Sequence, residues 1–257
     1  MMKSYKGYLI DLDGTIYRGK EPIPAAKRFI DKLQKKSIPF LFVTNNSTQT
    51  PEKVVKNLRM NFDIHVNINN VYTSGLATAD YVADLDEQKR SAYVIGESGL
   101  KKALFDRGFT FEEEQPDYTI VGLDYDVTYH KFELATLAIR NGSRFIGTNA
   151  DTNLPNERGL VPGAGSVISL VECATQQKAT YIGKPEPIIM KKALKKIGLS
   201  SNEVIMVGDN YMTDILAGIR SEIDTLLVYT GVSTHELIKQ KEIKPTYEIE
   251  SLDEWKF

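Results

Sequence analysis

The chain has 257 residues, of which 42% are hydrophobic and 26% are charged, with a formal net charge of -2 and a pI near 6.0. These values are ordinary for a globular protein, and the near-neutral charge gives no sign of a general affinity for nucleic acid or anionic membrane. Cys173 is the only cysteine, which rules out an intrachain disulfide and favours a reducing, cytoplasmic location.

The apolar runs of the sequence are short. The first one is broken at Asp11, which is too early for a signal-peptide core, and none approaches the roughly 20 residues that span a bilayer. We therefore expect no membrane partner. Cys173 lies in an apolar stretch that is typical of a helix, where we expect it to be a small buried hydrophobe.

In chain order, four short apolar runs end in polar or glycine-containing turns, as buried strands of a parallel sheet do. They cover residues 7–10, 39–43, 204–207 and 225–229. Apolar positions with helical spacing at 24–36 and 187–197 predict a helix before the second strand and another before the third. This alternation predicts an α/β fold.

The middle of the chain repeats the alternation with elements of its own. The predicted strands are 92–95, 118–121 and 144–147, and the predicted helices are 100–107 and 131–140. These elements suffice for a separate small sheet. We therefore expect an inserted domain at 77–178 and a core formed by residues 1–76 and 179–257.

The first predicted strand is followed by Asp11-Leu12-Asp13-Gly14-Thr15. An unpaired carboxylate inside a sheet costs several kcal/mol or becomes protonated. At the carboxyl end of a strand in an open α/β sheet, in contrast, such groups face the crevice where ligands bind. Asp11 and Asp13 are therefore candidate functional residues.

Three further polar clusters also follow predicted strands, and a parallel sheet brings such strand ends to one edge. They are Thr44-Asn45-Asn46-Ser47, Gly183-Lys184-Pro185, which follows a further predicted strand at 180–182, and Gly208-Asp209-Asn210 with Asp214. Carboxylates, one lysine and one hydroxyl fit phosphoryl transfer assisted by Mg²⁺, and no His or Cys cluster indicates zinc. Taken singly, these clusters have plainer interpretations. Thr44-Asn45 and Asp209-Asn210 are also typical of helix caps, Asn210 above all, and Lys184 could be a surface lysine.

The Asp11–Thr15 stretch, Thr44, Lys184, and Gly208-Asp209 with Asp214 resemble the four motifs of the haloacid dehalogenase superfamily, in their usual order. The segments 43–47, 147–155, 160–165 and 182–185 look like the NagD-type phosphatases, whose large C2-type cap lies between the second and third motifs. The resemblance implies a Rossmann-like parallel-sheet core with an inserted α/β cap domain.

The resemblance also implies a role for each matching side chain. Asp11 is the implied nucleophile, which forms an aspartyl-phosphate, and Asp13 is the implied general acid and base. Lys184 holds the phosphate and offsets the charge of Asp11. Thr44 donates a hydrogen bond to a phosphoryl oxygen, together with the backbone N–H of Asn45.

Mg²⁺ is the implied cofactor. By the resemblance, Asp11, Asp209 and the main-chain carbonyl of Asp13 bind it, while Asp214 orients Lys184 or a metal-bound water. The general acid indicates a phosphatase instead of a dehalogenase, because a halide leaves without a proton and an alkoxide does not.

The polar stretch 148–159 approaches the active site in the resembling proteins and helps to select the leaving group; a plain solvated loop is the alternative. A covered site favours small phosphate monoesters such as sugar phosphates, nucleotides or a vitamin phosphate. Leu154 stands where vitamin B6 phosphate phosphatases carry a histidine, which argues against that substrate. A small phosphorylated metabolite is the expected partner, and a homodimer is a candidate assembly.

Three other functions stay open at this point. One is a phosphomutase, which would have to retain the phosphate and return it to the substrate. A phosphoacceptor signalling domain also gathers aspartates, a hydroxyl and a lysine at strand ends, but such domains are much shorter and place their acidic pair side by side. A noncatalytic phosphate-binding protein would not need the complete set of acidic residues and lysine. The sequence thus predicts a Mg²⁺-dependent phosphoric monoester hydrolase.

Overall fold

The computed structural model describes residues 3–156 and 158–257 and divides into two compact units. The core unit comprises the chain up to Thr44, Pro51–Tyr72 and Lys184–Phe257, and the inserted unit comprises Asn45–Thr50 and Thr73–Gly183. Residues 1, 2 and 157, which belong to the predicted domain ranges, lie outside the described residues. The catalytic and substrate-selecting roles expected for the two domains stay predictions.

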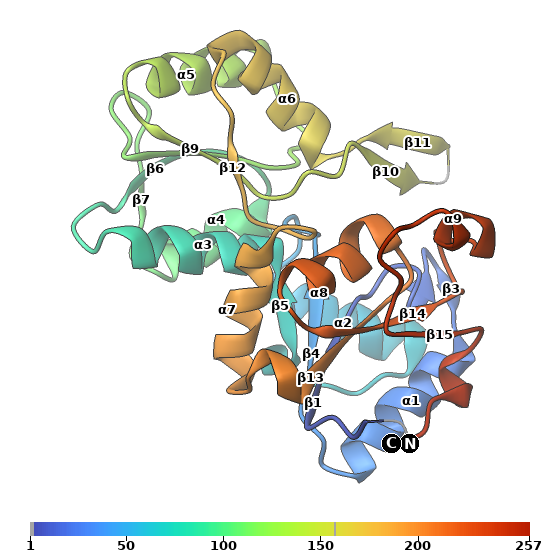
Figure 1. The fold of residues 1–257 in the computed structure, drawn as a ribbon. Helices are drawn as coiled ribbons and strands as arrows, with labels where there is room; N and C mark the ends of the chain where they lie inside the picture. The colour runs from blue at the N-terminus through green and yellow to red at the C-terminus, as the bar shows by residue number, and fades with distance from the viewer. Residues whose placement is uncertain (1–2, 157) are drawn as a thin grey trace. The chain divides into compact units, whose positions relative to one another are not determined.

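The core unit is built on a six-stranded sheet in the order β15-β14-β13-β1-β4-β5 (Figure 1). The strands are β1 (Gly7–Ile10), β4 (Phe40–Thr44), β5 (Val71–Thr73), β13 (Val204–Gly208), β14 (Asp224–Val228) and β15 (Tyr247–Ile249). The pairs between β15 and β4 are parallel. Every residue of β1, β4 and β13 is buried, which explains why these strands are apolar except for Thr44, the last residue of β4.

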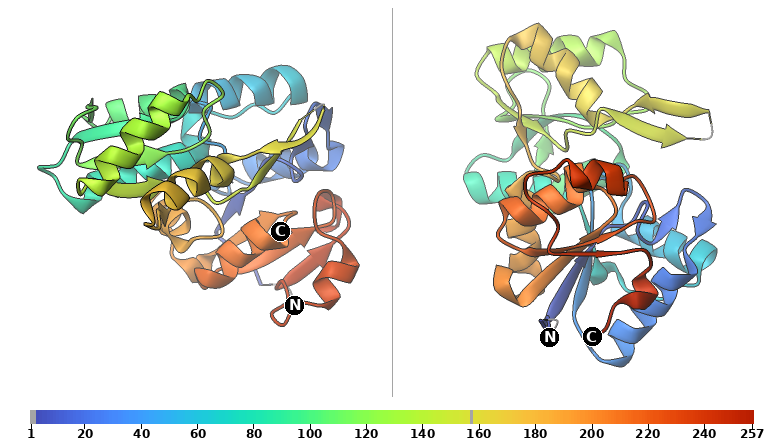
Figure 2. Two further views of the ribbon diagram at one scale, coloured as in Figure 1. Left: turned by 90° about the horizontal axis from the view of Figure 1, so that it is seen from above. Right: turned by 45° about the vertical axis from the view of Figure 1, so that its right-hand side comes forward.

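Helices lie on both faces of this sheet (Figure 2). The α-helices of the core unit are α1 (Pro24–Lys35), α2 (Pro51–Phe62), α7 (Pro187–Ile197), α8 (Leu216–Arg220) and α9 (His235–Lys239). In α1, Pro24 occupies the first turn, and Phe29, Ile30 and Leu33 are buried on one face in the core cluster. The short elements are β2 (Tyr17–Arg18), β3 (Glu21–Pro22), η1 (Ile68–Asn70), η2 (Ser201–Glu203), η3 (Tyr211–Ile215) and η4 (Leu252–Glu254).

The strand order reverses direction at the centre of the core sheet. From β1 the chain continues to β4 on one side, whereas from β13 it continues to β14 on the other side. Ligands of open α/β sheets bind outside the carboxyl ends of strands at such a reversal, because the connections diverge there and leave a crevice. The ends of β1 and β13 are therefore the expected place for a site in this unit.

The inserted unit has its own five-stranded parallel sheet in the order β12-β9-β8-β6-β7. Its strands are β6 (Ser91–Ile95), β7 (Thr110–Phe111), β8 (Tyr118–Val121), β9 (Arg144–Gly147) and β12 (Thr180–Tyr181), and its helices are α3 (Ser74–Leu85), α4 (Ser98–Phe105), α5 (Tyr129–Arg140) and α6 (Ala164–Thr175). The predicted fold class, a Rossmann-like parallel-sheet core with an inserted α/β unit, is confirmed.

The polar stretch 148–159, expected as a loop, contains part of a β-hairpin. The strands β10 (Asn153–Asn156) and β11 (Gly159–Pro162) are antiparallel, with Asn153 opposite Pro162 and Asn156 opposite Gly159. Polar and turn-forming residues dominate β10, so its sequence lacks the alternation that predicts a strand.

The expected burial of Cys173 was wrong. Cys173 lies on a helix, α6, as predicted, but its side chain is exposed. The neighbouring Glu172 is buried instead, because Lys178 and the backbone N–H of Ala179 donate hydrogen bonds to its carboxylate.

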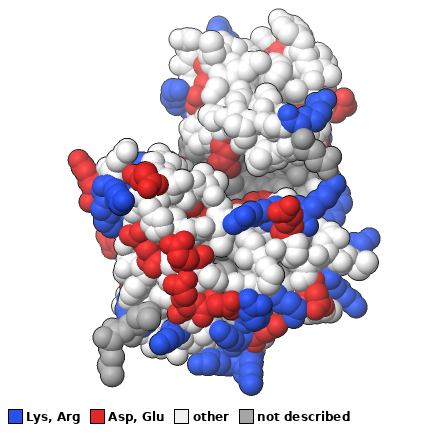
Figure 3. All heavy atoms as spheres, turned by 90° about the vertical axis from the view of Figure 1, so that its right-hand side faces the viewer, with Lys and Arg blue, Asp and Glu red and all other residues white. Residues whose placement is uncertain are grey.

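No helix among the described residues is both long and apolar enough to cross a lipid bilayer. On the face drawn in Figure 3, acidic and basic side chains are both present, and no single basic field covers that face. This distribution agrees with the small net charge of the chain.

Candidate active site

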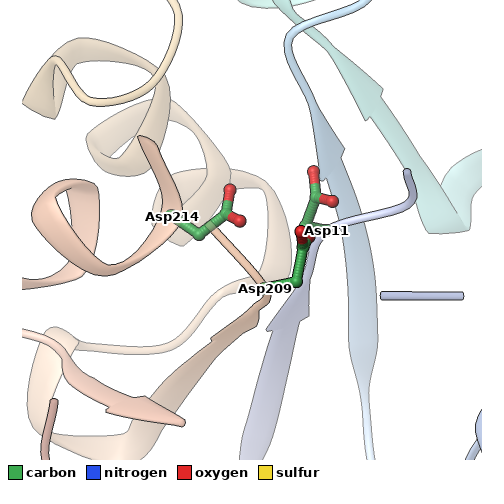
Figure 4. Close-up of side chains that lie close together, drawn as sticks. All are labelled: Asp11, Asp209 and Asp214. Atoms are coloured by element: carbon green, nitrogen blue, oxygen red, sulfur yellow. The ribbon is translucent and has the colours of Figure 1, made fainter. Parts of the chain in front are cut away.

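Three aspartates come together at the carboxyl ends of the two central strands of the core unit. Asp11 follows β1, Asp209 follows β13, and Asp214 lies in η3, with its carboxylate directed toward Asp11 (Figure 4). Each offers an oxygen that lies within 4.8 Å of the others. The exposed fractions are 8% for Asp11 and 1% for the other two. Such a buried acidic group requires compensating positive charge.

Lys184 supplies part of that charge. Its Nζ donates hydrogen bonds of 2.6 Å to Oδ1 of Asp11 and 2.7 Å to Oδ1 of Asp214. Burial alone would lower the pKa of Lys184, but the two carboxylates outweigh this effect and raise the pKa above its usual value. Lys184 is therefore a charged group at neutral pH, although it is only 1% exposed.

One ammonium does not balance three carboxylates. Burial is the main cause that raises the pKa of Asp11 well above its usual value, and the negative charge of Asp214 raises it further. Lys184 acts in the opposite direction but does not cancel these effects. For Asp209, burial and then Asp214 raise the pKa to about 6. The donors are all carboxylate oxygens, which hard divalent cations prefer, so this cluster could hold a metal ion.

The Asp209 carboxylate is held on both oxygens. Thr15, a fully buried residue, donates a hydrogen bond of 3.1 Å to Oδ1, and the backbone N–H of Val232 donates one of 2.8 Å to Oδ2. Both contacts lower the pKa of Asp209 and so oppose the effect of burial. The sequence motif contains Thr15, but we assigned it no role, and Val232 belongs to no motif.

Asp13 lies in the tight turn after β1. The backbone N–H of Gly14 donates a 2.7 Å hydrogen bond to the carbonyl of Tyr17, and Gly14 has a φ of +91°, which glycine adopts without strain. The Asp13 side chain is exposed, yet the protein around it removes enough hydration to raise its pKa, with Lys184 opposing this shift. Asp13 is thus an accessible carboxyl group that holds a proton more readily than usual.

Thr44 and Asn45 are adjacent in the chain but belong to different units. Thr44 ends β4 and is buried, and the pairing of Ile10 with Phe42 puts it at the same sheet edge as Asp11. Asn45 belongs to the inserted unit, where its Nδ2 lies 3.1 and 3.0 Å from the two carboxylate oxygens of Asp151.

Two other residues of that unit contact the backbone of Asn45. Asn149 donates a 2.9 Å hydrogen bond to the Asn45 carbonyl, and the Ser74 hydroxyl donates one of 2.6 Å to the same oxygen. The inserted unit therefore fixes the residue that directly follows Thr44. No sequence pattern linked Asn149 or Asp151 to Asn45.

Asn210 serves as a helix cap, one of the two interpretations that the sequence left open. Its Oδ1 accepts a hydrogen bond from the backbone N–H of Met212 at the start of η3. Its own backbone N–H donates a 3.0 Å hydrogen bond to Oδ2 of Asp214. The residue thus orders the turn that carries Asp214.

Two family models match the chain. One, described as haloacid dehalogenase-like hydrolase, covers residues 8–110, and a second, of the HAD-hydrolase-like type, covers residues 181–255. The two matches contain the ends of β1, β4 and β13 and the residues Asp11, Thr44, Lys184 and Asp209.

Whole-chain comparisons give the same family. The 5'-nucleotidase YutF of Bacillus subtilis is 49% identical over 99% of this chain and 98% of its own, and an acid sugar phosphatase of Staphylococcus aureus is 50% identical over 98% and 97%. A mutant thermostable NPPase of Geobacillus stearothermophilus has 55% identity and a TM-score of 0.93, with 99% of each chain covered. NagD of Escherichia coli has 33% identity, a TM-score of 0.93 and the same coverage.

Proposed function

Because the chain belongs to the haloacid dehalogenase-like hydrolase family, we propose that it is a phosphatase that hydrolyses small phosphate monoesters through an aspartyl-phosphate on Asp11. The observation that carries the proposal is the contact of Lys184 with Asp11 at the end of β1, with Asp13 two residues further on. The activities in the names of the two curated relatives, 5'-nucleotidase and acid sugar phosphatase, support the same reaction class.

In the first step, a carboxylate oxygen of Asp11 attacks phosphorus. The new bond joins this oxygen to phosphorus, and the bond from phosphorus to the ester oxygen breaks. Oδ1 accepts the hydrogen bond from Lys184, and Oδ2 accepts none from the described residues. Lys184 reduces the repulsion between the carboxylate and the phosphate dianion, so a weak nucleophile can approach.

Asp13 supplies the proton that the leaving alkoxide takes up. Its raised pKa keeps more of the acid form at a given pH than an ordinary carboxyl group would have. After the alcohol has left, the ionised Asp13 takes a proton from the water that attacks the aspartyl-phosphate. This second step releases inorganic phosphate and restores Asp11.

Mg²⁺ fits the acidic cluster, since its donors are oxygens and two negative charges remain after Lys184 is counted. The side chains of Asp11 and Asp209 and the main-chain carbonyl of Asp13 are the proposed ligands. When bound, the ion neutralises charge on the phosphate and lets the clustered carboxylates stay ionised.

Thr44 and the backbone N–H of Asn45 are the proposed donors to the phosphoryl oxygens. Asp214 is proposed to position Lys184. The substrate is proposed to be a small phosphorylated metabolite, selected in part by the inserted unit. The names of the relatives favour nucleoside monophosphates and sugar phosphates as the first classes to compare.

The test is turnover of p-nitrophenyl phosphate by the purified protein with Mg²⁺ and, separately, with excess chelator. We expect many turnovers per molecule with Mg²⁺ and a loss of about 10⁴-fold or more in the Asp11→Asn variant. A single turnover would indicate a phosphoacceptor protein, and wild-type turnover by the variant would exclude Asp11 as the nucleophile. Ranking phosphorylated metabolites by kcat/KM then identifies the substrate class.

A further inference from the structure

The loop after β14, residues 230–233, reaches the Asp209 carboxylate although none of its residues belongs to a recognised motif. In the sheet, β13 lies between β14 and β1. The loops that follow β14 and β1 therefore flank the residue that follows β13. Asp209 is that residue. Its carbonyl accepts a 3.1 Å hydrogen bond from the backbone N–H of Ser233.

The two flanking loops hold the two oxygens of the Asp209 side chain. Thr15, from the loop after β1, donates to Oδ1, and the backbone N–H of Val232, from the loop after β14, donates to Oδ2. A carboxylate oxygen has two lone pairs. One hydrogen bond to each oxygen therefore fixes the orientation of the group and leaves a lone pair on each for a cation.

Two glycines let these loops come this close. A Cβ atom on Gly231 would lie 1.9 Å from Oδ2 of Asp209, and a Cβ atom on Gly14 would lie 2.4 Å from the same oxygen. Gly14 has a positive φ, but Gly231 does not. Glycine is therefore required at position 231 only because there is no room for a Cβ atom. Any side chain at position 231 must displace the carboxylate or the loop.

The loops are also joined to each other. The Thr230 hydroxyl donates a 2.6 Å hydrogen bond to the carbonyl of Gly14, and Nε of Arg18 donates one to the carbonyl of Thr230. These contacts link residues more than 200 positions apart in the chain. They explain how a loop without secondary structure keeps a fixed position over Asp209.

We propose that Thr15, Thr230, Gly231 and Val232 form a clamp that positions Asp209 for metal binding. The inference rests on the proposed function, because it assumes that Asp209 is a ligand of Mg²⁺. The clamp residues do not contact the metal themselves. They are positioning residues, and removing one of them costs metal affinity because Asp209 loses its orientation.

The experiment measures metal binding directly, by the loss of the electron paramagnetic resonance signal of free Mn²⁺ as protein is added, with Mg²⁺ as competitor. We expect Thr15→Val to raise the Mn²⁺ dissociation constant about tenfold or more, and Thr15→Ser to restore it. Gly231→Ala is expected to act in the same direction. Turnover of p-nitrophenyl phosphate at saturating metal should largely recover, since the defect lies in affinity.

Two control variants separate positioning from general destabilisation. Thr119→Val removes another buried threonine hydroxyl, which pairs with Ser143 in the inserted unit. Gly7→Ala places a methyl group 2.4 Å from Leu199 at the amino end of β1. Both controls should keep the wild-type affinity for Mn²⁺.

Wild-type affinity in Thr15→Val overturns the clamp, whether or not Gly231→Ala folds. An equal loss of Mn²⁺ affinity in Thr15→Val and in the control Thr119→Val also overturns it. If the wild-type protein neither binds Mn²⁺ nor turns over substrate, the proposed function fails instead, so the two failures are distinguishable.

Discussion

Lys184 donates a 2.7 Å hydrogen bond to Oδ1 of Asp214, and each residue is only 1% exposed. Oδ2 of Asp214 accepts a second hydrogen bond, from the backbone N–H of Asn210. Oδ1 also accepts a 3.3 Å hydrogen bond from the Thr213 hydroxyl, so both lone pairs of that oxygen are occupied, whereas each oxygen of Asp209 accepts one bond. Asp11 differs, since its Oδ2 accepts no hydrogen bond from the described residues. This difference favours Asp214 as the residue that positions Lys184 and Asp11 as the one that binds reactants.

The Asp214→Asn variant tests this division of roles. We expect kcat for p-nitrophenyl phosphate to fall about 10- to 100-fold, because Lys184 loses one of its two charged partners, while Mn²⁺ affinity stays near the wild-type value. Asp224→Asn, at the amino end of β14, makes the same change of charge far from the sheet edge in question and should leave kcat unchanged. Lost metal affinity with a normal kcat at saturating metal would make Asp214 a direct ligand.

Stabilisation of the protein by Mg²⁺ should depend on pH. The folded-state pKa of Asp209 is raised to about 6, from about 3.9 for an ordinary aspartate. The metal-free folded protein therefore binds a proton more tightly than the unfolded chain, and this residue makes the metal-free protein less stable as pH rises through that interval. Mg²⁺ replaces the proton, so the rise in Tm caused by Mg²⁺ should be small at pH 4.5 and large at pH 7.

Thermal unfolding with and without Mg²⁺ across this pH range measures the effect. The Asp209→Asn variant carries no titrating group at this position and should show a small response to Mg²⁺ at every pH. An equal rise in Tm at pH 4.5 and pH 7 in the wild-type protein would contradict the competition between metal and proton.

The two central strands, which carry Asp11 and Asp209, could be predicted because their sequences are simple. The run 204–207 was predicted as a strand, and β13 covers Val204–Gly208 with every residue buried. A strand that is buried on both faces has to be apolar throughout, so the first charged residue after it marks its end. The positions of Asp11 and Asp209 at strand ends follow from this rule. The expectation for the strand before Lys184 was wrong, since β12 pairs in the sheet of the inserted unit and does not end at the edge of the core sheet.

The remaining features depend on contacts between distant residues. The edge strands β5 and β15 have three residues each, too few for a recognisable pattern. Residue type and the apolar stretch around it suggested that Cys173 is buried, but its burial depends on the face of α6 on which it lies. The hydrogen bond between Thr15 and Asp209 spans 194 positions, and neither local sequence indicates it.

Glu172 is expected to stabilise the inserted unit above acidic pH. Its burial raises the pKa, but hydrogen bonds from Lys178 and from the backbone N–H of Ala179 outweigh this and lower the pKa below its usual value. Such a carboxylate stabilises the fold above its unfolded-state pKa and loses this effect as pH falls through its folded-state pKa.

Glu172→Gln should therefore lower the free energy of unfolding by about 1 kcal/mol at pH 7 and by little near pH 3. Urea unfolding at the two pH values gives the difference. Glu133→Gln, an exposed position on α5, makes the same change of charge and should have little effect at pH 7. A loss for Glu172→Gln that is equal at both pH values would assign the effect to packing.

Asp13→Asn should reveal the general acid through its dependence on the leaving group. An alkyl phosphate needs a proton on its departing oxygen, whereas p-nitrophenolate leaves readily without one. The proposed acid contributes about 10²- to 10⁴-fold to the first chemical step for the alkyl ester and far less for p-nitrophenyl phosphate. Rapid-quench measurement of phosphoenzyme formation isolates that step. Because Asp13 is exposed, the variant should keep the Tm of the wild-type protein. An equal loss of rate for both esters in this step would exclude Asp13 as the general acid.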